Sequence, residues 1–113
     1  MESQHQYATI LEAIVRDYCD WADRAADETL ENCLIFDRDR GYYLWIQIGW
    51  NGDRRISRTV IFARLKQGKI WIEEDWTTEG IVTDLLKSGI PTGDIVLAFH
   101  PPQKRSLSEF ATA

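Results

Sequence analysis

The chain has 113 residues, of which 44% are hydrophobic and 27% charged, and its formal net charge at pH 7 is -5. This balance is typical of a folded globular domain and excludes a disordered, collagen-like or membrane-spanning composition. Because no repeat, linker or low-complexity stretch divides the sequence, we expect residues 1–113 to form one domain.

The first predicted element is an amphipathic helix that runs from Tyr7 to Asp23 or Arg24. Its apolar residues recur at spacings of three and four, with charged residues on the other side. The apolar positions are Ile10, Leu11, Ile14, Val15, Tyr18, Trp21 and Ala22. We expect this stripe to pack on a flat apolar surface.

Beyond residues 25–31 the pattern changes to short β-rich runs separated by turn residues. Four strands are predicted, at residues 32–37, 42–50, 56–65 and 70–74. Asn51-Gly52 is the strongest hairpin signal among the turns, since both residues tolerate the positive φ of a type I′ turn. Tight turns between consecutive strands predict an antiparallel four-stranded meander.

A second, shorter helix of about three turns is predicted after Thr77 or Thr78, either of which can cap it. Its apolar residues share one face before Gly89 and Pro91 end it. Residues 95–99 are too short an apolar run for periodicity to decide between a helical turn and a buried strand. The predicted fold class is α+β, with a long N-terminal helix and a short C-terminal one.

Alternation divides the second strand into two sets of side chains. One set contains Tyr42, Leu44, Ile46, Ile48 and Trp50, and we assign it to the core; the other contains Tyr43, Trp45, Gln47 and Gly49. The neighbouring strands likewise carry apolar residues on both sides, so a second cover is required. Either the two helices cover opposite faces of the sheet, or Tyr43, Trp45 and Trp71 meet a partner or a second copy.

The sequence holds few groups that could carry catalysis. His100 precedes two prolines and is the one histidine outside the N-terminal segment, but no spacing pairs it with Cys19, Cys33 or a serine. The acidic run at residues 73–75 is more typical of a solvated charge cluster than of a cation site. No phosphate-binding glycine loop is present. We therefore expect a protein without catalytic residues, metal or cofactor, and treat His100 as a possible functional residue only.

Positive charge is concentrated in the middle of the chain. Residues 38–69 hold eight basic side chains against two acidic ones, whereas residues 1–31 hold eight acidic against two basic ones. The arginines Arg38, Arg40, Arg54, Arg55 and Arg58 could bind a phosphate backbone, with Trp50 stacking on a base. A sequence pI of about 4.9 argues against direct DNA binding. The same arginines could instead pair with an acidic partner or with the acidic helices of this chain.

The longest uncharged apolar run, residues 41–51, is shorter than the roughly 20 residues needed to cross a bilayer. The N-terminus also lacks the basic opening and apolar stretch of a secretory signal. We therefore expect a cytoplasmic protein in which both cysteines stay reduced and serve as small core residues.

The run of residues 43–55, from Tyr43 through Asn51-Gly52 to Arg55, resembles the core of the XisI-like family of cyanobacterial fdxN element excision controlling factors. Residues 68–75, 89–102 and 109–113 are similar to later parts of the family pattern in the same order. The resemblance implies an accessory protein in programmed DNA excision, a separate recombinase carrying out strand exchange.

The family resemblance also implies a partner, a companion excision factor of the XisH-like type. Together with the apolar residues on both sides of the sheet, it leads us to expect a homodimer that acts as a protein-interaction module. The residues that we expect to bind partners are Tyr43, Trp45, Trp71, Arg54, Arg55 and Arg58. The alternative is a factor that binds DNA directly through the basic hairpin between the second and third strands.

Overall fold

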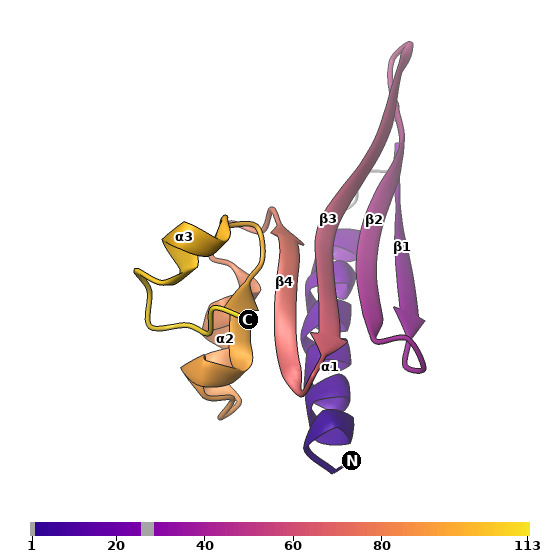
Figure 1. Ribbon diagram of the computed structural model, residues 1–113. Helices are drawn as coiled ribbons and strands as arrows, with labels where there is room; N and C mark the ends of the chain where they lie inside the picture. The colour runs from indigo at the N-terminus through magenta and orange to yellow at the C-terminus, as the bar shows by residue number, and fades with distance from the viewer. Residues whose placement is uncertain (1, 26–28) are drawn as a thin grey trace.

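The computed structural model of the protein describes residues 2–25 and 29–113 and contains one five-stranded sheet (Figure 1). Its strands lie in the order β1-β2-β3-β4-β5. Their bounds are β1 Leu30–Asp37, β2 Tyr42–Asn51, β3 Arg54–Lys66, β4 Lys69–Asp75 and β5 Ile95–Leu97. The helices are α1 Glu2–Arg24, α2 Ile81–Lys87 and α3 Pro102–Arg105, and a 3-10 turn, η1 Thr92–Asp94, precedes β5.

The prediction of an antiparallel four-stranded meander is correct for β1 to β4 and wrong for the sheet as a whole. The fifth strand pairs in parallel with β4, where Ile70 is opposite Ile95 and Ile72 is opposite Leu97. A parallel pair needs a crossover connection, and helix α2 supplies it. Local periodicity could not identify β5, because a strand of three residues shows too little of its pattern.

The N-terminal helix follows its predicted stripe but begins earlier than predicted, at Glu2 instead of Tyr7. Leu11, Val15 and Cys19 are buried against the sheet. Helix α2 is shorter than predicted, with seven residues, and Ile81 and Leu85 join the same hydrophobic core. No helix among the described residues is long and apolar enough to span a membrane.

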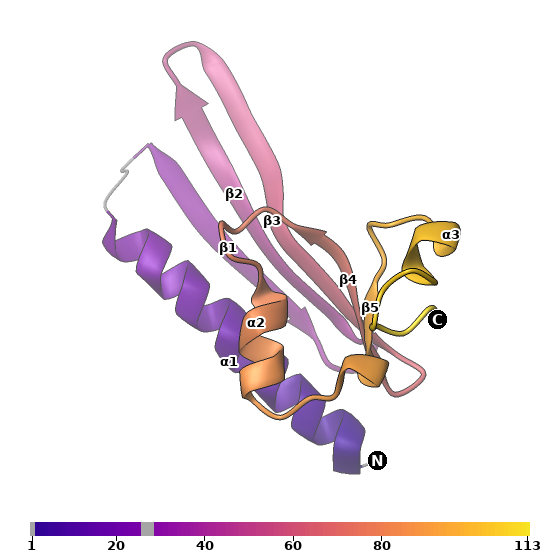
Figure 2. The same ribbon diagram turned by 90° about the vertical axis from the view of Figure 1, so that its left-hand side faces the viewer.

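Helices α1 and α2 lie on the same face of the sheet, as Figure 2 shows. The Tyr18 hydroxyl of α1 donates a hydrogen bond to the Asp84 carboxylate of α2 at 2.5 Å, and Tyr7 donates one to Asp94 at the same distance. The interpretation in which the two helices cover opposite faces is therefore wrong. Neither α1 nor α2 lies on the opposite face, and within residues 2–25 and 29–113 it is the short C-terminal segment around α3 that lies on that side (Figure 2).

The assignment of the core side of β2 is also wrong. Tyr43 and Trp45 are buried, at 0% and 5% exposure, whereas Tyr42 and Trp50 are exposed on the other side. Alternation correctly separates the two sets but contains no information about which set the helices will cover. The helices cover the set that contains Tyr43 and Trp45.

Strands β2 and β3 extend past the rest of the sheet as a long hairpin (Figure 1). Asn51 pairs with Arg54, so the loop is Gly52-Asp53, and Gly52 has a φ of 62° while Asn51 stays extended as part of the strand. A positive φ at the first loop residue alone is the pattern of a type II′ turn, not the predicted type I′.

Candidate functional site

The face of the sheet opposite helices α1 and α2 carries an apolar surface, which we call the open face. Its side chains are neighbours across three strands, since Ile35 of β1 is opposite Leu44 of β2, and Leu44 is opposite Phe62 of β3. The open face consists of Ile35, Tyr42, Leu44, Ile46, Ile48 and Phe62, all at least partly exposed. Ile35 is 48% exposed. A half-covered sheet normally turns polar side chains to solvent, so an apolar set of this size on the uncovered face is unusual.

Charged groups lie at the margin of the open face, where Glu31 is opposite Ile48 and Asp37 is opposite Tyr42. The Arg64 guanidinium lies 3.4 Å from the Glu73 carboxylate and 5.9 Å from the centre of the Tyr42 ring. Trp71 lies beside them, with the Lys66 amine and the Arg105 guanidinium over its ring at 4.8 and 5.8 Å. Trp71 therefore lies on the opposite side of the sheet from Tyr43 and Trp45, with which the prediction grouped it, and its ring is contacted by cations of its own chain.

Tyr43 and Trp45, which we expected to bind a partner, belong to the core instead. The Trp45 indole Nε1 donates to Asn32 Oδ1 at 2.9 Å. The buried Tyr43 hydroxyl has no hydrogen-bond partner among the described residues. Neither side chain is available to a partner on the open face, because both point to the opposite side of the sheet, toward the helices.

The end of the long hairpin, residues 50–56, forms a projection that we call the arm (Figure 1). It presents Arg54 and Arg55 to solvent, and Arg58 follows at its base. The Arg55 guanidinium lies 5.2 Å from the centre of the exposed Trp50 ring, within the range of a cation–π contact. The arm thus brings the expected arginines of the third strand together at one end of the molecule.

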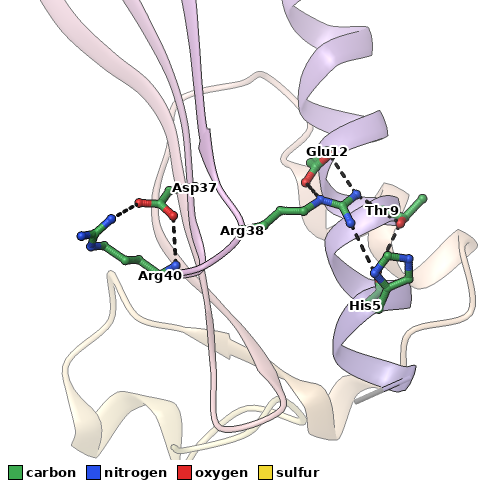
Figure 3. A network of polar contacts seen from close by, with 6 residues as sticks. All are labelled: His5, Thr9, Glu12, Asp37, Arg38 and Arg40. Carbon is green, nitrogen blue, oxygen red and sulfur yellow. Dashed lines mark hydrogen bonds and ion pairs between the residues drawn. The ribbon is translucent and has the colours of Figure 1, made fainter.

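Arg38 and Arg40 do not join the arm, although the nucleic-acid hypothesis grouped them with it. Arg38 Nε lies 2.6 Å from Glu12 Oε2, and its guanidinium also contacts Thr9 and the His5 ring (Figure 3). Arg40 bonds Asp37 at 2.9 Å, which lowers the pKa of that carboxyl. Arg38 therefore links the β1–β2 loop to helix α1. This is the alternative in which the arginines pair with acidic helices of the same chain.

A groove of about 710 Å³ lies on the helix side of the sheet, between the C-terminal end of α1 and the loop that follows β4. Its floor includes Trp45 and Val60, and two exposed tryptophans, Trp21 at 66% and Trp76 at 76%, line it. We call this surface the groove. Its acidic lining residues are Asp17, Glu79 and Asp84, and its basic one is Arg24.

A second hollow continues the groove toward the base of the arm. It shares Gln47, Val60 and Trp76 with the groove and adds Arg58. A chain of hydrogen bonds crosses the sheet there, since Arg58 Nε donates to Gln47 Oε1 at 2.9 Å and Gln47 Nε2 donates to Asn32 at 3.0 Å. The helix side of the sheet therefore changes from apolar to polar where the helices stop covering it.

Sequence reasoning missed the groove residues because they come from four helices and strands, α1, β2, β3 and α2, and from the loop after β4. Trp21 was assigned to the apolar stripe of α1 and so to the core, whereas it lies at the exposed end of that helix. Trp76 lies in a turn, where no periodicity applies. Trp76 itself was the one signal in the sequence, because a tryptophan outside any helix or strand is often exposed, and exposed tryptophans are enriched in interfaces.

His100 is separated from Cys33 by the width of the sheet. His100 follows β5 and Cys33 lies in β1, and these strands form opposite edges of the sheet. Cys19 is buried under α1, where burial raises the pKa of its thiol to about 11. That thiol is protonated at neutral pH and is a poor nucleophile. Cys19 is thus the small core residue that we predicted, whereas Cys33 is only partly buried.

The acidic run at residues 73–75 has structural roles. Glu73 pairs with Arg64, and Asp75 accepts hydrogen bonds from Thr77 and from the backbone N–H of Ile81. Within the described part of the chain, no group of three or more histidine, cysteine or acidic side chains is placed to hold a metal ion.

Comparison with known proteins places the chain in one family. Residues 1–112 match the family described as XisI protein. No curated protein is similar enough to count as a relative. One solved structure is that of the fdxN element excision controlling factor XisI from Anabaena variabilis ATCC 29413, 40% identical, with a TM-score of 0.87 over 98% of this chain and 99% of that chain.

A second solved structure is a XisI-like protein from the same organism. It is 33% identical to this chain, with a TM-score of 0.90 over 97% of this chain and 99% of that chain. Both similarities extend over essentially the whole of each protein, so they include the sheet, the helices and the hairpin that forms the arm. The chain therefore belongs to the XisI family.

Proposed function

We propose that this protein is a non-catalytic accessory factor of DNA-element excision that acts by binding other protein chains. It self-associates, and it binds an XisH-like companion protein through the open face. The accessory role is supported by membership of the XisI family and by the relative from Anabaena variabilis that is named an excision controlling factor.

The observation that carries this proposal is the open face itself. Six apolar side chains lie on three adjacent strands without a helix over them. Of the charged groups beside them, Arg64 pairs with Glu73 and Asp37 with Arg40, while Glu31 lies opposite Ile48. An apolar surface of this kind favours a partner that presents an equally apolar surface, because contact removes apolar area of both from water. Exposing an apolar patch of this kind to water is unfavourable in free energy.

The test is capture of an XisH-like protein encoded in the same genome by the tagged chain. We expect wild type to retain it and the double variant Ile35→Lys with Ile48→Lys to lose it, because two ammonium groups would have to be desolvated in an apolar contact, with Glu31 opposite only one of them. Both positions are already partly exposed, so the fold should tolerate the change. Leu107→Lys, at an exposed leucine beyond α3, is the matched control and should leave capture intact.

Loss of capture counts only if the melting temperature of the double variant stays near that of wild type. Equal capture by wild type and by the double variant would show that the open face does not bind the partner. Failure of wild type to capture any XisH-like protein would contradict the proposed partner.

The second candidate function is direct binding of DNA through the arm. It is favoured by the clustering of Arg54, Arg55 and Arg58 on a projecting hairpin next to an exposed Trp50. It predicts a mobility shift with duplex DNA at low salt that Arg54→Glu with Arg55→Glu abolishes, since phosphate contacts are strongest there. Absence of a shift with wild type at low salt would remove this candidate.

A further inference from the structure

The arm and the groove carry charges of opposite sign that form no ion pairs within the described part of the chain. The ion pairs among the described residues are Arg38–Glu12, Arg40–Asp37 and Arg64–Glu73. Arg54 and Arg58 on the arm side and Asp17 and Glu79 in the groove take part in none of them. Each set therefore remains free to pair with charges of another molecule.

The arm cannot reach the groove of its own chain. Cross-strand pairs from Ile48 with Ser57 to Asn51 with Arg54 hold it extended, away from the helices (Figure 2). By register, Arg58 is opposite Gln47 and Ile56 is opposite Gly49. Alternation thus places Arg54, Ile56 and Arg58 on the side of the hairpin that faces the groove.

We propose that the arm of a second copy of this chain occupies the groove, and that the two copies exchange arms about a two-fold axis. The two hairpins would then run side by side in opposite directions, each with its tip at the other copy's groove. Such an isologous contact closes on itself and buries both grooves at once. This inference rests on the proposed function, because it assigns the surface through which the protein self-associates.

The chemistry of the two surfaces fits this exchange. The Arg54 guanidinium of one copy meets the carboxylates of Asp17 and Glu79 of the other, in a groove whose exposed tryptophans offer ring faces for a cation–π contact. Ile56, between Arg54 and Arg58, covers the apolar floor around Val60. Opposite charges at the rim also direct the two chains into one register.

The experiment measures mass in solution by light scattering and the dissociation constant by sedimentation. Wild type should be a dimer of the 13.1 kDa chain. Arg54→Glu on the arm and Glu79→Arg in the groove should each raise the dissociation constant by about 100-fold, because each change puts like charges together twice in the dimer. Lys87→Glu, on the exposed surface of α2, is the charge-matched control and should remain dimeric.

Mixing the two weakened variants gives the decisive result. In a mixed dimer, the arm that carries Arg54→Glu enters the groove that carries Glu79→Arg, and the unchanged arm enters the unchanged groove, so both contacts are complementary again. We expect the mixture to form a heterodimer with a dissociation constant within about 10-fold of wild type. Contacts through any other surface would not be rescued by mixing.

Three outcomes would overturn the inference: a monomeric wild type, dimers that both variants retain, or a mixture that stays monomeric. A mobility shift with DNA that depends on Arg54 but not on Glu79, together with a monomeric wild type, would assign the arm to nucleic acid. Failure of the arm exchange can be told apart from failure of the proposed function. The charge variants leave the open face intact and should still capture the XisH-like protein.

Discussion

The Asp75 carboxylate holds the loop that forms one wall of the groove. We expect its removal to lower the stability of the fold. Its Oδ1 accepts hydrogen bonds from the Thr77 backbone N–H and hydroxyl at 3.0 and 2.6 Å, and its Oδ2 accepts one from the Ile81 N–H at 2.7 Å. Helix α2 has no side-chain cap at its own N-cap residue, Gly80. The Asp75 carboxylate therefore satisfies a helix amide that would otherwise lack a partner.

The expected loss follows from these contacts. A helix cap contributes about 0.5–2 kcal/mol, and a hydrogen bond to a charged group about 1.5–3 kcal/mol. Water replaces part of the loss because Asp75 is only partly buried, so we expect Asp75→Ala to lower the free energy of unfolding by about 2–4 kcal/mol. For a domain of this size the melting temperature should fall by about 8–16 °C.

The assay is urea unfolding followed by tryptophan fluorescence, with calorimetry for the melting temperature. Asp75→Asn should recover about half of the loss, because one amide oxygen can serve Thr77 or Ile81 but not both. Asp53→Ala, in the exposed loop at the tip of the arm, should stay within about 0.5 kcal/mol of wild type. An Asp75→Ala variant as stable as wild type would refute the capping role.

Two further predictions concern the backbone and pH. Gly49→Ala should destabilise the protein by about 2 kcal/mol or more in urea unfolding, because its Cβ would lie 2.0 Å from the Thr29 carbonyl oxygen; an unchanged midpoint would contradict this close approach. The hydrogen bond to Asp94 raises the pKa of Tyr7 from 10.0 to about 12, so the bond's stabilisation should be complete below pH 10 and be lost as pH rises toward 12. The stability difference between wild type and Tyr7→Phe should therefore shrink across that range, and a constant difference would refute the assignment.

The antiparallel part of the fold could be predicted because its signals are local. The stripe of α1 and the four β-rich runs each repeat over enough residues to show their period, and turn residues separate them. The positions of strands β1 to β4 were correct to within about two residues at each end, as expected for boundaries that depend on fraying hydrogen bonds.

The candidate site was less predictable, since it depends on which face of the sheet the helices cover. The expectation that Tyr43 and Trp45 bind a partner is wrong for this reason, and the residues of the alternate set, such as Tyr42, are the exposed ones. The predicted hairpin that carries Arg54 and Arg55 is present, because a tight turn joins two strands that are neighbours in the chain; the role of these arginines in binding stays a prediction.

The amino-acid sequence by itself determined the helix, the hairpins and the concentration of arginines on the arm, because each follows from neighbours along the chain. Only the tertiary structure decided that α1 and α2 share one face, that β5 pairs in parallel with β4, and that four elements meet to form the groove. The physical reason is that alternation marks two faces without ranking them, and burial is decided by packing between segments that are distant in the chain.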